Sequence, residues 1–145
     1  MNLKIASIIG FGLAVLGLIF LLEKNYILSK NPITIIIQLC SLTLMIWSRL
    51  VFGIRSFHAT ANTTKGKLIT TGPYRLLRHP IYAAVIYFSW ASIIAFPLVE
   101  TIAAACLISG GLFVRMLLEE KSLMATYDDY AAYSQHTKRI IPFIF

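Results

Sequence analysis

Four long apolar segments constrain this chain more than any other feature. They cover Ile5–Leu22, Ile33–Phe52, Ile81–Phe96 and Leu98–Leu118. A helix of about 20 residues crosses the hydrocarbon core of a bilayer, so the third segment is short unless it starts earlier or tilts. Hydrophobic residues make up 58% of the chain, and a 145-residue soluble core cannot bury that much apolar surface. The sequence therefore predicts an all-α, polytopic integral membrane protein with about four transmembrane helices.

The segments between and after these runs predict how the helices are joined. Lys4 precedes the first run as in a secretory signal, but its apolar stretch is too long and no small-x-small cleavage site follows, so we expect a retained helix. Asn31-Pro32 is expected to start the second helix, and Phe96-Pro97 to form a tight hairpin between the third and fourth. After Glu120, polar and apolar residues alternate at helical spacing, which predicts a C-terminal amphipathic helix on the membrane surface or capping the bundle.

The distribution of positive charge predicts an orientation. If the N-terminus is cytoplasmic, eleven of the thirteen Lys and Arg residues lie on one side, and only Lys24 and Lys30 lie on the other. The positive-inside rule then places both termini, and the polar connection between the second and third helices, in the cytoplasm. The net charge of +7 is accordingly interpreted as topology and attraction to the anionic lipid bilayer, with no nucleic-acid partner.

A basic, polar island runs from Lys67 to Tyr82, just ahead of the third apolar segment. Charged groups at a bilayer are costly, so they indicate a functional site. Because Pro80 suits the first turn of a helix, Arg78 and His79 precede free N–H groups at its positive end, which favours an anion site. The alternative is that the arginines only reach lipid headgroups and fix the topology.

Opposite charges end the fourth apolar segment. Arg115 and Glu119 are four residues apart and share a helix face, whereas Glu120 is rotated by about 100°. They are explained either by an ion pair within the helix or by a site in which Arg115 grips an anionic substrate and Glu119 accepts hydrogen bonds from a cationic or hydroxylated ligand. The three histidines are far apart, which predicts no metal site, and no glycine-rich nucleotide-binding motif is present.

Several motifs together resemble a known family. The order LITTGPYRLLRHPIY, an apolar hairpin, EEKSLMATYDDYAAY and a closing KRIIP is similar to the isoprenylcysteine carboxyl methyltransferase and phospholipid methyltransferase superfamily of integral membrane enzymes. The resemblance covers about Lys67–Pro142, and the first two apolar segments match only as spans. The chain has no internal repeat, low-complexity tract or linker, so we expect a single membrane domain over residues 1–145 with two N-terminal spanning helices in 1–55. The resemblance implies that residues 56–145 form the cofactor-binding catalytic region.

The resemblance also implies a reaction, a cofactor and site residues. S-adenosyl-L-methionine would donate a methyl group to a lipophilic or lipid-linked acceptor at the cytoplasmic membrane face. The arginine Arg115 is expected to face the acceptor, and His79 is a further catalytic candidate. Where many relatives have glycine two residues after the RHPxY tyrosine, this chain has Ala84. The residues expected to bind the cofactor are Gly66, Lys67, Leu68, Ile69, Tyr74, Arg78, His79, Pro80, Ile81, Tyr82 and Glu119.

Alternatives remain open at this point. The same superfamily shape is similar to that of membrane sterol reductases, which use NADPH, and a non-catalytic lipid-binding or assembly subunit would also fit the composition. Transfer of a sulfonium methyl needs mainly alignment and exclusion of water, so a sparse site suffices. The accepting atom, O, N or S, is not defined by the sequence, and no obligate protein partner is inferred.

Overall fold

The computed structural model of the chain describes residues 3–53 and 68–145. All regular elements in these residues are helices: α1 (Leu3–Glu23), α2 (Pro32–Phe52), the 3-10 turn η2 (Gly72–Arg75), α3 (Pro80–Ala95), α4 (Val99–Thr126) and α5 (Tyr130–His136). Helices α1, α2 and α4 are long and apolar enough to cross a membrane, and α3 is a shorter apolar helix of 16 residues. The predicted all-α membrane fold is confirmed.

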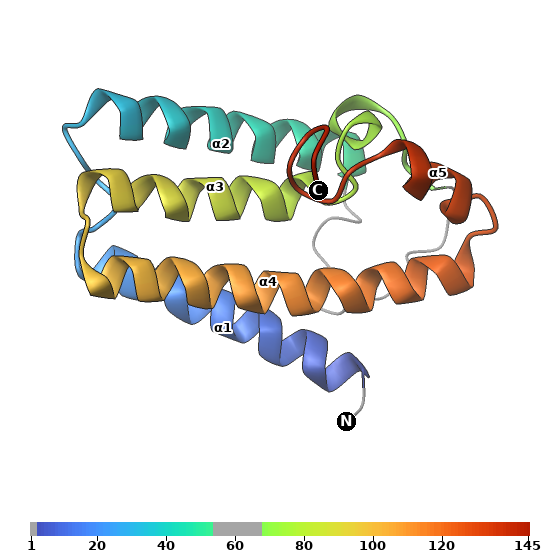
Figure 1. Cartoon of the computed structure of the whole chain (residues 1–145), viewed down its shortest axis with the longest axis horizontal. Coiled ribbons are helices and arrows are strands. Elements are labelled where there is room, and N and C mark those ends of the chain that lie inside the picture. The colour runs from blue at the N-terminus through green and yellow to red at the C-terminus, as the bar shows by residue number, and fades with distance from the viewer. Residues whose placement is uncertain (1–2, 54–67) are drawn as a thin grey trace.

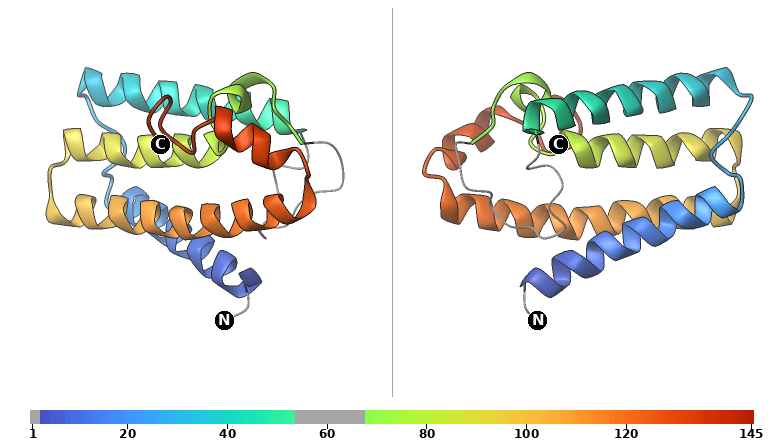
Figure 2. Two further views of the ribbon diagram at one scale, coloured as in Figure 1. Left: turned by 45° about the vertical axis from the view of Figure 1, so that its right-hand side comes forward. Right: turned by 180° about the vertical axis from the view of Figure 1, so that it is seen from behind.

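The spatial order of the helices differs from their order in the chain. Figure 1 shows a row in which α2 packs on α3, α3 on α4, and α1 on the far side of α4, and both views in Figure 2 agree. The connections α1–α2 and α3–α4 lie at one end of the bundle. The start of α1, η2 and α5 lie toward the other end, and the C-terminal segment lies beside the start of α3. Helix α4 is therefore the central element, with α1 on one face and α3 on the other.

Small residues bring α1 and α4 into close contact. A Cβ added to Gly10 would lie 2.5 Å from the carbonyl oxygen of Gly111, and one added to Gly111 would lie 2.3 Å from the carbonyl oxygen of Gly10. Membrane helices associate through such close backbone approach, since lipid supplies no hydrophobic driving force between them. Ala14, Leu21 and Ile108 continue the same interface as a buried core. This contact fixes the position and rotation of α4.

Local sequence signals set the helix ends. The Asn31 side chain accepts hydrogen bonds from the backbone N–H groups of Ile33 and Thr34, and Pro32 occupies the first turn of α2. Pro80 does the same for α3, whose first turn follows His79 directly. Helices α3 and α4 are joined by residues 96–98 alone, as the Phe96-Pro97 pair predicted.

The structure corrects the C-terminal boundaries. The fourth apolar segment was expected to end at Leu118 and to be followed by an amphipathic helix, but α4 continues to Thr126 and only the seven-residue α5 follows. No proline or glycine interrupts the residues between Leu118 and Thr126, so the helix propagates through them. As a result, Glu119 and Glu120 lie within a continuous helix rather than at its end.

Candidate active site

The C-terminal segment fastens the turn that precedes α3. The backbone N–H of Arg78 donates to the carbonyl of Lys138 (2.7 Å), that of His79 donates to Arg139 (3.0 Å), and that of Lys138 donates to Leu76 (3.1 Å). Tyr133 of α5 adds a hydrogen bond from its hydroxyl to the Tyr74 carbonyl at 2.7 Å. The start of α3 is therefore held by residues about 60 positions later in the chain, and this fixes the directions of Arg78 and His79.

Glu120 and the three basic side chains around it form a cluster that we call the basic clamp: Arg78, His79, Glu120 and Arg139. Glu120 Oε1 lies 3.3 Å from Arg78 Nε and 3.3 Å from His79 Nε2. Arg139 donates to Glu120 Oε2 from Nε and lies 3.0 Å away through Nη2. The His79 side chain is almost fully buried. Three basic groups thus surround one buried carboxylate. Their ion pairs with Glu120 join the start of α3 and the C-terminal segment to α4.

A second group, the Tyr82 cluster, consists of Tyr82, Arg115 and Glu119. The Tyr82 hydroxyl donates to Glu119 Oε2 at 2.6 Å and accepts from Arg115 Nε at 2.7 Å. Arg115 is buried, with its guanidinium 5.1 Å from the centre of the Phe11 ring and Nη1 3.4 Å from Ser7 Oγ. Arg115 and Glu119 are therefore linked through the phenol, and α1 contributes the cover over the arginine.

The two neighbouring carboxylates differ in what remains available to a ligand. The Glu119 side chain is 26% exposed, against 11% for Glu120. Among the described residues, one hydrogen bond, from Tyr82, reaches Oε2 of Glu119 and none reaches Oε1. His79 lies between the carboxylates, with Nδ1 3.9 Å from Glu119 and its ring stacked on Tyr82. Glu119 is consequently the carboxylate that can accept a further hydrogen bond or face a cation.

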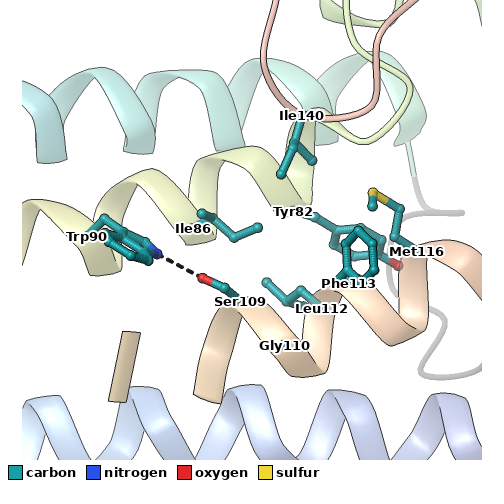
Figure 3. A pocket seen from close by; sticks show the side chains of 9 residues that line it. All are labelled: Tyr82, Ile86, Trp90, Ser109, Gly110, Leu112, Phe113, Met116 and Ile140. Carbon is teal, nitrogen blue, oxygen red and sulfur yellow. Dashed lines mark hydrogen bonds between the residues drawn. The ribbon is translucent and has the colours of Figure 1, made fainter. Parts of the chain in front are cut away.

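An apolar groove between α3 and α4 begins at the Tyr82 cluster. It has a volume of about 400 Å³ and is lined by Tyr82, Ile86 and Trp90 of α3, by Ser109, Gly110, Leu112, Phe113 and Met116 of α4, and by Ile140. Figure 3 shows Tyr82 and Met116 at one end and Trp90 with Ser109 at the other. The volume is within the range of small-molecule sites. The ring of Phe145 stacks on Phe113, so the C-terminal segment also forms the rim near Ile140.

The structure places the residues expected to bind the cofactor in different surroundings. Gly66 and Lys67 lie outside the described residues. Leu68 and Ile69 are half-buried ahead of η2, while Pro80 and Ile81 begin α3 beside His79. Tyr74 is buried in η2, and burial raises the pKa of its phenol. The members that the fold brings to one point are His79, Tyr82 and Glu119.

The contacts of Arg78 and Ala84 can be stated from the geometry. Arg78, which was expected to serve an anion at the start of α3, lies 3.3 Å from Glu120 through Nε and donates from Nη1 to the Ser134 carbonyl at 3.4 Å. Ala84 is buried and does not line the groove, so its methyl group leaves the groove unchanged.

Some residues of this site were missed by sequence reasoning. Glu120, Arg139, Ser7 and Phe11 were not among the residues expected to form the site. Arg139 carries a signal, because it belongs to the closing KRIIP motif. Ser7 and Phe11 carry none, since their role depends on α1 crossing α4.

Comparison with known proteins identifies one family. The model of the family described as Phospholipid methyltransferase matches residues 32–130, well over half of the chain. The match runs from the start of α2 into α5 and includes both the basic clamp, apart from Arg139, and the Tyr82 cluster. Neither the curated proteins nor the solved structures gave a match.

Proposed function

The chain belongs to the phospholipid methyltransferase family, and we propose that it transfers a methyl group from S-adenosylmethionine to a lipophilic acceptor. The observation that carries this proposal is the position of Glu119. Its partly exposed carboxylate lies beside Tyr82, where an apolar groove between two membrane helices reaches the polar end of the bundle. A charged, water-soluble donor and a lipid-borne acceptor can meet only at such a boundary.

The residues around Glu119 fit a cationic donor. S-adenosylmethionine carries a positive sulfonium and an ammonium group, and a free carboxylate oxygen in a partly dry site binds such groups through charge-assisted hydrogen bonds. Tyr82 holds the carboxylate by donating to Oε2, which leaves Oε1 to face the ligand. His79, stacked on Tyr82 and buried, supports that phenol from behind. We therefore assign Glu119, Tyr82 and His79 to the cofactor site.

The chain's own part in the reaction is to position the reactants and exclude water. The bound donor would supply an already activated methyl group, so neither a metal nor a covalent nucleophile is required. Alignment of reacting atoms at about 3–3.5 Å in a closed site provides most of the acceleration for such a displacement. Phe113, Met116 and Ile140 line the apolar side of this boundary and keep water from it.

Arg115 is the residue that we assign to the acceptor. Its guanidinium lies one turn deeper along α4 than Glu119 and donates to the Tyr82 hydroxyl, which lines the groove. An acceptor that advances along the groove meets Tyr82 first and Arg115 behind it. The arginine would stabilise an acidic headgroup at that point, either directly or by polarising the phenol.

We also propose that this end of the bundle faces the cytoplasm. The basic clamp lies there beside η2 and the C-terminal segment. The α1–α2 connection, which contains Lys24 and Lys30, lies at the opposite end, in agreement with the positive-inside rule. Reporter fusions at Phe145 and within residues 24–31 should report opposite sides of the membrane. Equal accessibility of both fusions would contradict this orientation.

Ligand-dependent thermal unfolding tests the function. A ligand of the native state stabilises it by about 2.7 kcal/mol at 100 times its Kd. We expect S-adenosylhomocysteine to raise the unfolding temperature of the purified full-length protein, to a much smaller extent in Glu119→Gln, and NADPH to have no effect. Stabilisation by NADPH alone would indicate a reductase, and stabilisation by neither compound would indicate a non-catalytic subunit.

A further inference from the structure

The α3–α4 groove has the shape of a channel for one hydrocarbon chain. Tyr82, Ile86 and Trp90 are spaced four residues apart, so they line one face of α3 along its axis. Opposite them, Gly110 lacks a side chain, and a Cβ built on it would meet no atom within 4 Å. The groove is therefore open beside Gly110 and is bounded by apolar side chains along its length (Figure 3).

The end away from Tyr82 is closed by a hydrogen bond between the two helices. The Trp90 indole N–H donates to Ser109 Oγ at 2.8 Å, and Ser109 in turn donates to the Ala105 carbonyl at 2.7 Å. Both polar groups are thereby satisfied, so this end presents an apolar ring face rather than a site for a polar ligand. The indole is held across the groove at a fixed position along α3.

The distance between the two ends sets a length. Tyr82 and Trp90 are eight residues apart, which corresponds to about 12 Å of helix at 1.5 Å per residue. An extended polypeptide advances roughly 3.3–3.6 Å over three backbone bonds, or about 1.2 Å per bond, so about ten bonds of an alkyl chain fill this length. A longer chain has to bend around the indole toward the outer surface, where Trp90 is partly exposed.

We propose that this groove holds the alkyl chain of the methyl acceptor itself and that Trp90, fastened by Ser109, sets the preferred chain length. The proposal rests on the proposed function and adds a specificity determinant to it. Because the chain comes from bilayer hydrocarbon, moving it into the groove gains no hydrophobic free energy, and selection has to come from fit. The groove is continuous with the Tyr82 cluster, so a chain within it places its own headgroup beside Glu119 and Arg115.

The experiment compares chain lengths in four variants of the full-length protein. Methyl transfer is measured with n-alkyl phosphoethanolamines of 8, 10, 12 and 16 carbons. Gly110→Leu fills the groove, Trp90→Ala removes its end, and Ser109→Ala releases the indole. Gly12→Leu is the matched control, because a Cβ at Gly12 also meets no atom within 4 Å and Gly12 does not line the groove.

A second measurement detects the chain without turnover. In a Trp47→Phe background, Trp90 is the one remaining tryptophan of the two in the sequence. Its fluorescence is quenched by decyl phosphocholine carrying bromine on the terminal carbon, and competition with unbrominated decyl phosphocholine separates saturable quenching from contact with bulk detergent. S-adenosylhomocysteine binding is measured in parallel to establish that each variant is folded.

We expect kcat/KM to be highest near ten carbons and to fall by at least about fivefold at sixteen, since excess methylenes overfill the groove. Trp90→Ala should abolish that decline, Ser109→Ala should reduce it, and Gly12→Leu should keep it. Gly110→Leu should lose transfer to every chain of ten or more carbons and the saturable quenching, while retaining S-adenosylhomocysteine binding.

The other outcomes separate this inference from the proposed function. Active variants with an unchanged chain-length profile, or a wild type without saturable quenching, overturn the inference and leave methyl transfer intact. If Gly110→Leu lowers stability but leaves the dependence of kcat/KM on chain length unchanged, the inference is overturned, and the groove is assigned to a membrane lipid that only stabilises the fold. Saturable quenching that Gly110→Leu removes, without methylation of any acceptor, supports chain binding and counts against the proposed function alone.

Discussion

The basic clamp and the Tyr82 cluster are adjacent on α4 but use their carboxylates in opposite ways. Glu120 is enclosed by Arg78, His79 and Arg139. Its carboxylate pairs with these groups and thereby joins α3 and the C-terminal segment to α4. Glu119 has the Tyr82 phenol on one oxygen and is more exposed. One position along the helix thus separates a carboxylate suited to holding the fold from one suited to binding a ligand.

The largest effect should follow from breaking the basic clamp. Glu120→Gln leaves three basic groups without a counter-charge, and removing one partner of a buried pair costs about 3 kcal/mol at the lower end of the usual range. We expect that loss in the free energy of unfolding, measured by thermal or denaturant unfolding in detergent. Glu119→Gln is the matched control and should change stability by less than about 1 kcal/mol. Equal destabilisation by both variants would mean that Glu119 contributes to stability as much as Glu120 does.

The same two variants should reverse their order in cofactor binding. Glu119→Gln should weaken S-adenosylhomocysteine binding by roughly 1.5–3 kcal/mol, the range for a hydrogen bond to a charged group. Glu120→Gln, in whatever fraction remains folded, should weaken it less. Calorimetric titration measures both. Equal losses would mean that the ligand faces both carboxylates and that the face of α4 has been misassigned.

Arg115 tests whether the Tyr82 cluster also serves the acceptor. Arg115→Ala should lower methyl transfer at least tenfold, which is about 1.4 kcal/mol of transition-state stabilisation, with little change in cofactor affinity. Arg115→Lys should recover only part of the rate, because an ammonium cannot reproduce the planar, multiply donating guanidinium. A parallel loss of cofactor binding and turnover would show that Arg115 acts only by holding Tyr82, and through it Glu119, in place.

The smallest effect concerns the phenol of Tyr133 in α5, which donates to the Tyr74 carbonyl. Burial raises the pKa of Tyr133 to about 12, above the ordinary value of about 10 for tyrosine. The unfolded chain therefore loses this proton first, so the contribution of Tyr133 to stability is complete below pH 10 and disappears as the pH rises through 12. We expect the unfolding temperature to fall over that interval, and to fall less steeply in Tyr133→Phe. Identical slopes in the two proteins would assign the alkaline loss to other groups.

Most of the fold could be predicted because its signals are local. Apolar runs, Asn31-Pro32 and Phe96-Pro97 predicted α1, α2, α3 and the start of α4 with bounds close to those observed. The extension of α4 to Thr126 was missed because the change from apolar to polar composition near Leu118 was taken for a helix end. Composition reports the surroundings of a helix, whereas its end requires a residue that stops hydrogen bonding along the backbone.

The candidate site was predictable only in part. The RHPxY motif and the Glu119–Glu120 pair were predicted to belong to a functional site, and the fold does bring them together. Which carboxylate meets the basic residues depends on the rotation of α4, and neighbouring residues differ by about 100° around the axis. No local pattern specifies that angle.

By itself, the sequence determined that this is a helical membrane protein and that charged groups gather at one end of its last two long helices, since hydropathy and helix signals act over a few residues. Only the tertiary structure decided that α1 packs on the far side of α4 through Gly10 and Gly111, and that this contact turns Glu120 toward the clamp and Glu119 toward Tyr82. Packing of distant segments sets that rotation, because the close approach of two backbones allows one arrangement of the helices and excludes its neighbours.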